Sequence, residues 1–152
     1  MTRKFALSLL TVAALSACAS YDAPQNSRQW IFNADGGEAR LAYGTPQSDD
    51  APLMMSCRSG GRVSISQNQL QPGDGVTLES GPARTTFHGE AEPDQLNGGT
   101  IVTADAAVTS PVLQAFRRSG RLAMVENGRT ARLPASPAER AQIQRFFEVC
   151  QA

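Results

Sequence analysis

The sequence predicts a mainly β domain: an antiparallel β-sandwich or barrel-like fold with one short helix and a C-terminal α-helix stapled by a disulfide. Three observations lead to this class. From residue 29 onward, short apolar runs alternate with turn signals at close spacing, which is typical of an all-β sandwich or barrel. Residues 136–150 instead repeat apolar side chains at helical spacing. Cys57 and Cys150 fall in these two kinds of segment.

Three hairpins account for most of the predicted strands. Each joins two short apolar runs across a glycine-containing turn: residues 29–33 with 39–44, 53–58 with 62–67, and 76–80 with 84–90. The first is expected to turn at Asp35-Gly36. Within 62–67, Val63 and Ile65 alternate with polar residues, so one face of that strand is apolar. Residues 98–104, which begin with two glycines, are predicted to form a further strand.

The next segment is a short helix followed by a hairpin. Ser110 is the expected N-cap, Pro111 occupies the first helical position and Gly120 ends the helix. Residues 121–134 then form a hairpin, because Asn127-Gly128 is the strongest short turn signal in the chain.

The last element is the clearest helix. Ser136 and Glu139 have the spacing of a capping box, and Pro137 lies in the first turn. Four residues at helical spacing form one apolar face of this helix: Ile143, Phe146, Phe147 and Cys150. Cys150 is therefore expected to point inward, where the strand carrying Cys57 can meet it.

The chain begins with features of an export signal. Arg3 and Lys4 precede an apolar run at residues 5–15, and small residues follow. A membrane-spanning helix needs about 20 apolar residues, so this run is too short to span. The alternative, a buried helix of the domain, does not explain the basic start.

Leu15-Ser16-Ala17-Cys18 resembles the lipobox of bacterial lipoprotein precursors. The resemblance implies cleavage before Cys18, a diacylglycerol thioether on its sulphur and acylation of the new amine. Residue 19 is alanine rather than the aspartate associated with inner-membrane retention, which implies sorting to the outer membrane. The expected organisation is a signal peptide at 1–17, a lipidated cysteine with a flexible tether at 18–28, and one extracytoplasmic domain at 29–152.

The cysteine count is consistent with this organisation. Lipidation of Cys18 leaves Cys57 and Cys150, which oxidising conditions outside the cytoplasm favour as a disulfide. A metal or redox pair is the alternative, but the sequence has one histidine and no CxxC motif. Cleavage would leave 12 of the 14 basic residues against 14 acidic ones, and this near-neutral balance argues against nucleic acid as a partner.

No catalytic motif stands out, so we predict no enzyme, no cofactor and no metal site. His88 shares a strand face with Glu90 and Glu92, which we interpret as a solvated face because a zinc site usually draws three or four protein ligands. A serine hydrolase would be expected to show a G-x-S-x-G turn, which is absent. A hydrolase using His88 stays as an alternative.

Two clusters are candidates for ligand or partner contacts. Arg117, Arg118 and Arg121 lie at a predicted helix-to-strand junction, where they either clamp an anion or only complement the helix dipole. Asp49 and Asp50 lie in a polar loop. A third group consists of the aromatic residues Trp30, Phe32 and Tyr43, for which a core role is favoured over an interface.

The function expected from these features is non-enzymatic. We expect an outer-membrane lipoprotein, held through Cys18, that binds an envelope or exported protein and so modulates a secreted enzyme, secretion or envelope assembly. A tether raises the local concentration at the membrane, which makes weak contacts effective. The alternative from another class is an inhibitor of a host or rival hydrolase such as lysozyme. The inhibitor family's SGSGxxY-like loop is missing, since CRSGG at residues 57–61 does not match it.

Overall fold

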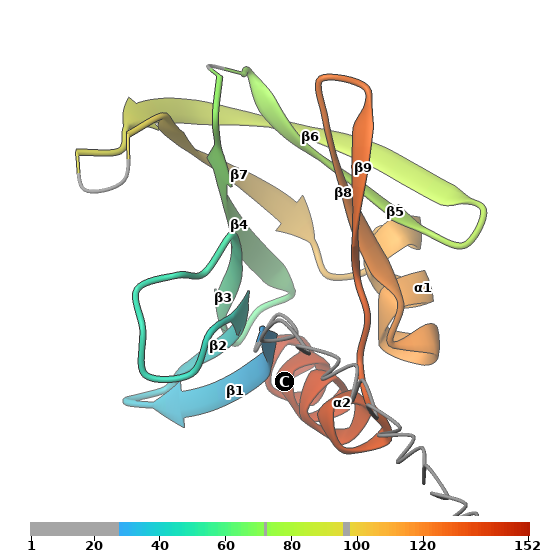
Figure 1. Cartoon of the computed structure of the whole chain (residues 1–152). Helices are drawn as coiled ribbons and strands as arrows, with labels where there is room; N and C mark the ends of the chain where they lie inside the picture. Colours follow the sequence, from blue (N-terminus) through green and yellow to red (C-terminus); the bar gives the residue numbers. More distant parts are fainter. Residues whose placement is uncertain (1–27, 72, 96–97) are drawn as a thin grey trace, which may run out of the picture.

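The computed structural model describes residues 28–71, 73–95 and 98–152 and confirms the mainly β class with two helices (Figure 1). The elements in chain order are β1 (Gln29–Asp35), β2 (Glu38–Gly44), β3 (Leu53–Arg58), β4 (Arg62–Gln69), β5 (Gly75–Ser80), β6 (Ala83–Pro93), β7 (Thr100–Ala107), α1 (Pro111–Ser119), β8 (Leu122–Glu126), β9 (Arg129–Leu133) and α2 (Pro137–Gln151). The predicted signal peptide and lipobox, and the tether up to residue 27, lie outside the described residues.

The strands form one curled antiparallel sheet of nine strands, in the order β1-β2-β3-β4-β7-β6-β5-β8-β9. The long strand β6 connects its two halves: residues 83–88 pair with β5, and residues 89–93 pair with β7. Gly89 lies at this change of partner, where a Cβ atom would collide with the Thr103 carbonyl oxygen. A glycine there lets the backbone of β7 approach closely.

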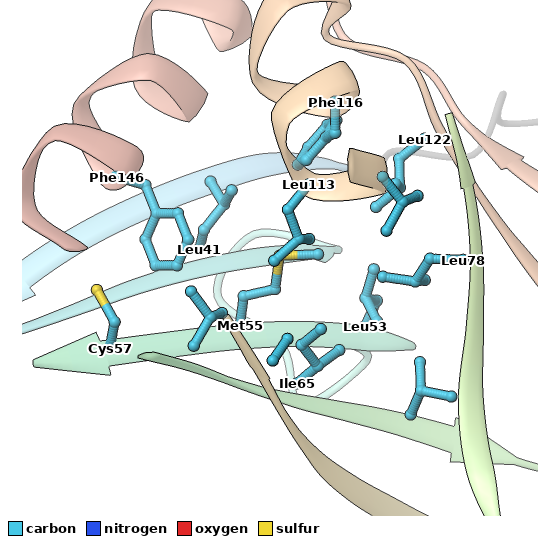
Figure 2. Packing of buried hydrophobic residues seen from close by; sticks show 14 of the residues in the cluster. Leu41, Leu53, Met55, Cys57, Ile65, Leu78, Leu113, Phe116, Leu122 and Phe146 are labelled. Carbon is cyan, nitrogen blue, oxygen red and sulfur yellow. The ribbon is translucent and has the colours of Figure 1, made fainter. Parts of the chain in front are cut away.

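The core lies inside the curl, beneath the two helices. α2 packs on β1, β2 and β3, whereas α1 packs on β5, β6 and α2 (Figure 1). Figure 2 shows apolar side chains of the strands meeting Leu113 and Phe116 of α1 and Phe146 of α2. The ring centroid of Trp30 lies 4.8 Å from that of Phe116 and 5.3 Å from that of Tyr43. Trp30 and Tyr43 are therefore core residues, and Phe32 is partly buried beside them.

The predicted helix boundaries hold, although one cap does not form as expected. Ser136 accepts the Glu139 amide at 3.3 Å, and Glu139 accepts the Ser136 amide at 2.6 Å, which completes the capping box. Gly120 ends α1 with a left-handed φ of 64°. Ser110 occupies the N-cap position of α1, but its side chain makes no capping bond and its Oγ is buried without a partner among the described residues.

The hairpins match the prediction apart from one turn. Asn127 and Gly128 have φ of 49° and 74°, the left-handed pair that a tight hairpin requires. In the first hairpin the central residues are Gly36-Gly37 rather than Asp35-Gly36, because Asp35 still pairs with Glu38. Both central positions of this turn need a positive φ, and glycine adopts a positive φ at less cost than aspartate. The Gly-Gly pair is therefore favoured over Asp-Gly at the centre of the turn.

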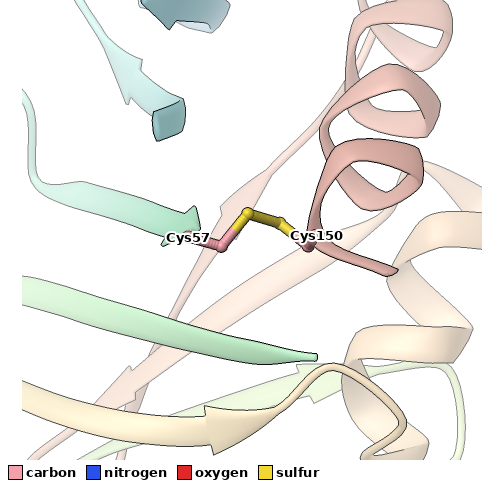
Figure 3. The surroundings of a disulfide bond; sticks show 2 residues. All are labelled: Cys57 and Cys150. Carbon is pink, nitrogen blue, oxygen red and sulfur yellow. A yellow bond between two sulfur atoms is a disulfide. The ribbon is translucent and has the colours of Figure 1, made fainter. Parts of the chain in front are cut away.

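The disulfide joins the sheet to the C-terminal helix, as predicted. Cys57 near the end of β3 and Cys150 in the last turn of α2 have Cα atoms 5.6 Å apart (Figure 3). Backbone hydrogen bonds reinforce the same junction: the Gly61 amide donates to the Cys150 carbonyl at 2.9 Å, and the Val108 amide donates to the Gly61 carbonyl at 2.8 Å. One end of the curled sheet is thus held to α2 covalently and by hydrogen bonds.

The β1 edge of the sheet is covered by α2. The Trp30 amide donates to Glu139 Oε1 at 2.8 Å, and the Phe32 amide donates to Gln142 Oε1 at 3.0 Å. The two acceptors are three residues apart on one helix face, so they match alternate outward-facing amides of an edge strand. This cover leaves those two amides unable to pair with another chain.

Neither described helix is long and apolar enough to cross a membrane.

Candidate functional site

Two hollows meet at the end of β4 opposite the disulfide, and Leu70 lines both. The first, which we call the acidic hollow, has a volume of about 500 Å³ and includes Asp49, Asp50 and Asp94 among its lining residues. The second, the inner hollow, has a volume of about 370 Å³ and lies between β4 and the β8–β9 hairpin. Together they make this end of the sheet a candidate binding surface.

Leu70 is exposed, and its backbone is held by neighbouring residues. The residue is 88% exposed, and the only other large apolar residue exposed in the described part of the chain is Met54, at 40%. The Leu70 amide donates to Glu126 Oε1 at 2.8 Å. Gly99, with φ of 88°, packs its backbone against Gln69 and Leu70. Because the backbone at Leu70 is already ordered, this segment loses less conformational entropy when a partner covers it than a free loop would.

Gln67 contributes a buried polar group to the inner hollow. Strand alternation places Gln67 on the same face as Val63 and Ile65, and the residue is only 1% exposed. Its Oε1 meets no hydrogen-bond donor among the described residues. A buried amide oxygen without a donor costs about 1–3 kcal/mol. A hydrogen-bond donor from a partner that enters the inner hollow would offset this cost, which favours a binding role for Gln67 over a purely stabilising one.

An ion pair shapes the acidic hollow. Arg28 donates to both carboxylate oxygens of Asp50, at 2.9 and 2.8 Å, and Thr45 Oγ1 donates to Asp50 at 3.0 Å. The hydrogen bond from Arg28 lowers the pKa of the Asp50 carboxyl below its usual value. Because both side chains are partly exposed, the pair adds little stability but fixes the loop after β2 against the start of β1. Arg28, expected as the last tether residue, thus contacts the domain.

The structure separates the sequence-predicted contact residues. Asp49 and Asp50 line the acidic hollow. Arg121 lines a third, outer groove of about 690 Å³ together with Arg132. Arg117 lies in the last turn of α1, and its Nη1 donates to Gln151 Oε1 of α2 at 2.6 Å. Arg118, also in that last turn, is exposed and lines none of the three hollows.

The surroundings of His88 agree with a solvated strand face. His88, Glu90 and Glu92 are exposed along β6. The nearest acidic group to the imidazole is Asp74, with 3.7 Å between His88 Nδ1 and Asp74 Oδ2. Among the described residues, no three His, Cys, Asp or Glu side chains are grouped so that they could hold a metal ion.

Leu70, Gln67 and Arg132 were missed by sequence reasoning. A signal existed for Gln67, because the apolar alternation of Val63 and Ile65 continues with glutamine on the same strand face. Leu70 and Arg132 carry no such signal, since their positions depend on which strands become neighbours. Comparison of the chain with protein-family models, curated proteins and solved structures gave no match.

Proposed function

We propose that this chain is an outer-membrane lipoprotein, anchored through Cys18, whose domain binds another envelope or exported protein without catalysing a reaction. The observation that carries the binding role is Leu70, an exposed apolar residue whose backbone is hydrogen-bonded and which lines two hollows. The Cys57–Cys150 disulfide supports a location outside the cytoplasm, where such bonds persist.

The energetics favour a contact centred on Leu70. Full burial of a leucine side chain is worth about 1.5–3 kcal/mol, and the flanking hollows offer room for side chains of a partner. Two or more acyl chains on Cys18 would hold the domain stably at the membrane. A partner in the same envelope then meets the domain at a raised effective concentration, so a modest contact suffices.

Site-specific photo-crosslinking in living cells tests this proposal. A photoreactive amino acid replaces Leu70, and in a matched strain it replaces Met54, the other large apolar residue that is exposed in the described part of the chain. We expect a discrete crosslinked protein at position 70, none at position 54, and loss of the position-70 product when Cys18→Ser prevents anchoring. Equal crosslinking at both positions, or none at position 70, would contradict a binding surface at this end of the sheet.

A further inference from the structure

The second edge of the sheet, β9, is open among the described residues. The strand order ends at β9, so no described strand pairs beyond it. Glu126 pairs with Arg129 across the two-residue turn, so these two residues form a hydrogen-bonded pair. In an antiparallel ladder hydrogen-bonded pairs alternate with pairs that are not hydrogen-bonded. The backbone N–H and C=O groups of Thr130 and Arg132 therefore point away from β8. The same alternation on β1 turns the Trp30 and Phe32 amides outward, where α2 covers them. No described residue covers the corresponding groups of β9.

Hollows lie on both faces of this open edge. Met124 and Ala131 line the inner hollow, whereas Arg121 and Arg132 line the outer groove. Thr130 lines both. Because successive side chains of a strand point to opposite faces, a strand added outside β9 would place alternate side chains in the inner hollow and in the outer groove.

The two faces differ in chemistry. In the outer groove, Arg121 and Arg132 have no ion-pair partner among the described residues, while the carboxylate of Glu79 is held by Arg84 at 2.6 Å. The outer groove therefore suits acidic side chains, which arginine binds in bidentate fashion. The inner hollow combines the apolar side chains of Leu70, Met124 and Ala131 with polar residues that include Gln67, Glu126 and Arg129. An apolar side chain of an added strand can pack against its apolar part, formed by Leu70, Met124 and Ala131.

We propose that β9 is a docking edge that takes an extended segment of a partner protein as an additional strand, with acidic and apolar residues in alternation. The acidic side chains lie over Arg121 and Arg132, and the apolar ones enter the inner hollow beside Met124. Main-chain hydrogen bonds to β9 supply affinity, and the two hollows supply specificity. This inference rests on the proposed binding function and names the chemistry of its partner.

Peptide titration tests the docking edge. The purified full-length product in detergent micelles is titrated against a fluorescein-labelled peptide Glu-Val-Glu-Val-Glu-Val and its charge-reversed counterpart Lys-Val-Lys-Val-Lys-Val, with fluorescence anisotropy as the readout. We expect the acidic peptide to bind at least about tenfold more tightly than the basic one, since like charges oppose the basic peptide. Hydrogen exchange of the backbone should slow at residues 129–133 when the acidic peptide binds.

Variants separate the backbone contribution from the charge contribution. Thr130→Pro removes one outward amide without removing a bond to β8, and it should weaken peptide binding at least about tenfold. Arg132→Glu changes an exposed side chain and should weaken binding about fivefold or more, whereas the matched control Arg118→Glu, outside the groove, should leave binding unchanged. If Thr130→Pro perturbs folding, the effect of Arg132→Glu and the hydrogen-exchange pattern still test whether the peptide binds along β9.

Three results would overturn the inference. These are equal binding of both peptides, equal effects of the substitutions at Arg132 and Arg118, or self-association through β9 in sedimentation experiments, which would make a second copy the occupant. Crosslinking from position 70 that persists while neither peptide binds would refute the docking edge and leave the proposed function standing. Peptide binding without any crosslinking from position 70 would instead refute the surface centred on Leu70.

Discussion

Replacing both Cys57 and Cys150 by alanine should remove much of the stability of the domain. The two residues are 93 positions apart in the sequence, so their bond closes a large loop in the unfolded chain. For a loop of this length the chain-entropy treatment gives a stabilisation of about 4.6 kcal/mol. Small domains have total unfolding free energies of about 5–15 kcal/mol, so this one bond represents a large part of the total.

The double variant also loses two sulphur atoms from the core, because Cys57 is 5% exposed and Cys150 is fully buried. Urea unfolding followed by far-ultraviolet circular dichroism separates the two effects. The comparison includes the oxidised protein, the reduced protein and the double alanine variant. Reduction removes the crosslink and keeps both side chains, so the difference between the reduced protein and the variant reports the packing loss.

We expect the unfolding midpoint in urea to fall by about 2–3 M on reduction, for a denaturant dependence of about 1.5–2 kcal/mol per M. The double variant should unfold at a slightly lower concentration still. A loss smaller than about 1 kcal/mol on reduction would refute the reasoning. It would mean that the unfolded chain gains little freedom when residues 57 and 150 separate.

Three further substitutions test the core, the covered edge and the helix end. Trp30→Ala should lower the free energy of unfolding by about 3–5 kcal/mol, because the buried indole packs against Phe116; urea unfolding measures it. At Glu139, burial opposes ionisation, but hydrogen bonds from Ser136 and the Trp30 amide outweigh it and lower the pKa of the carboxyl below its usual value. A carboxyl whose pKa is lower in the folded state than in the unfolded state stabilises the fold at pH values above the unfolded-state pKa. This stability is lost as the pH falls through the folded-state pKa. The neutral variant Glu139→Gln should therefore lose less stability than the wild type between pH 7 and pH 3, and an unchanged pH profile would contradict this. Gly120→Ala should cost about 1–2 kcal/mol in a thermal melt, because Gly120 has a left-handed φ and a Cβ atom would meet the Arg140 side chain.

Local features of the fold were predictable because neighbouring residues alone determine them. The Asn127-Gly128 turn and the Ser136–Glu139 capping box each depend on a few adjacent positions, and both form as expected. The cysteine pairing was predictable for a different reason: two cysteines remained, and the helical spacing placed Cys150 on the inner face of its helix.

The arrangement of the strands was not predictable in the same way. β4 pairs with β7 rather than with the next strand in sequence, and β6 changes partner at Gly89. These pairings join segments far apart in the chain, and no local pattern specifies them. The hollows around Leu70 and on both faces of β9 follow from those pairings. The candidate site was therefore predicted only in part, through Asp49, Asp50 and Arg121.

Intact mass spectrometry of the mature protein tests the central claim, that one cysteine carries the membrane anchor while the other two crosslink the domain. The account predicts a chain that begins at Cys18, carries a diacylglyceryl group and an amide-linked acyl chain, and takes up no alkylating reagent until it is reduced. An N-terminus without lipid, or free thiols at Cys57 and Cys150 before reduction, would contradict it.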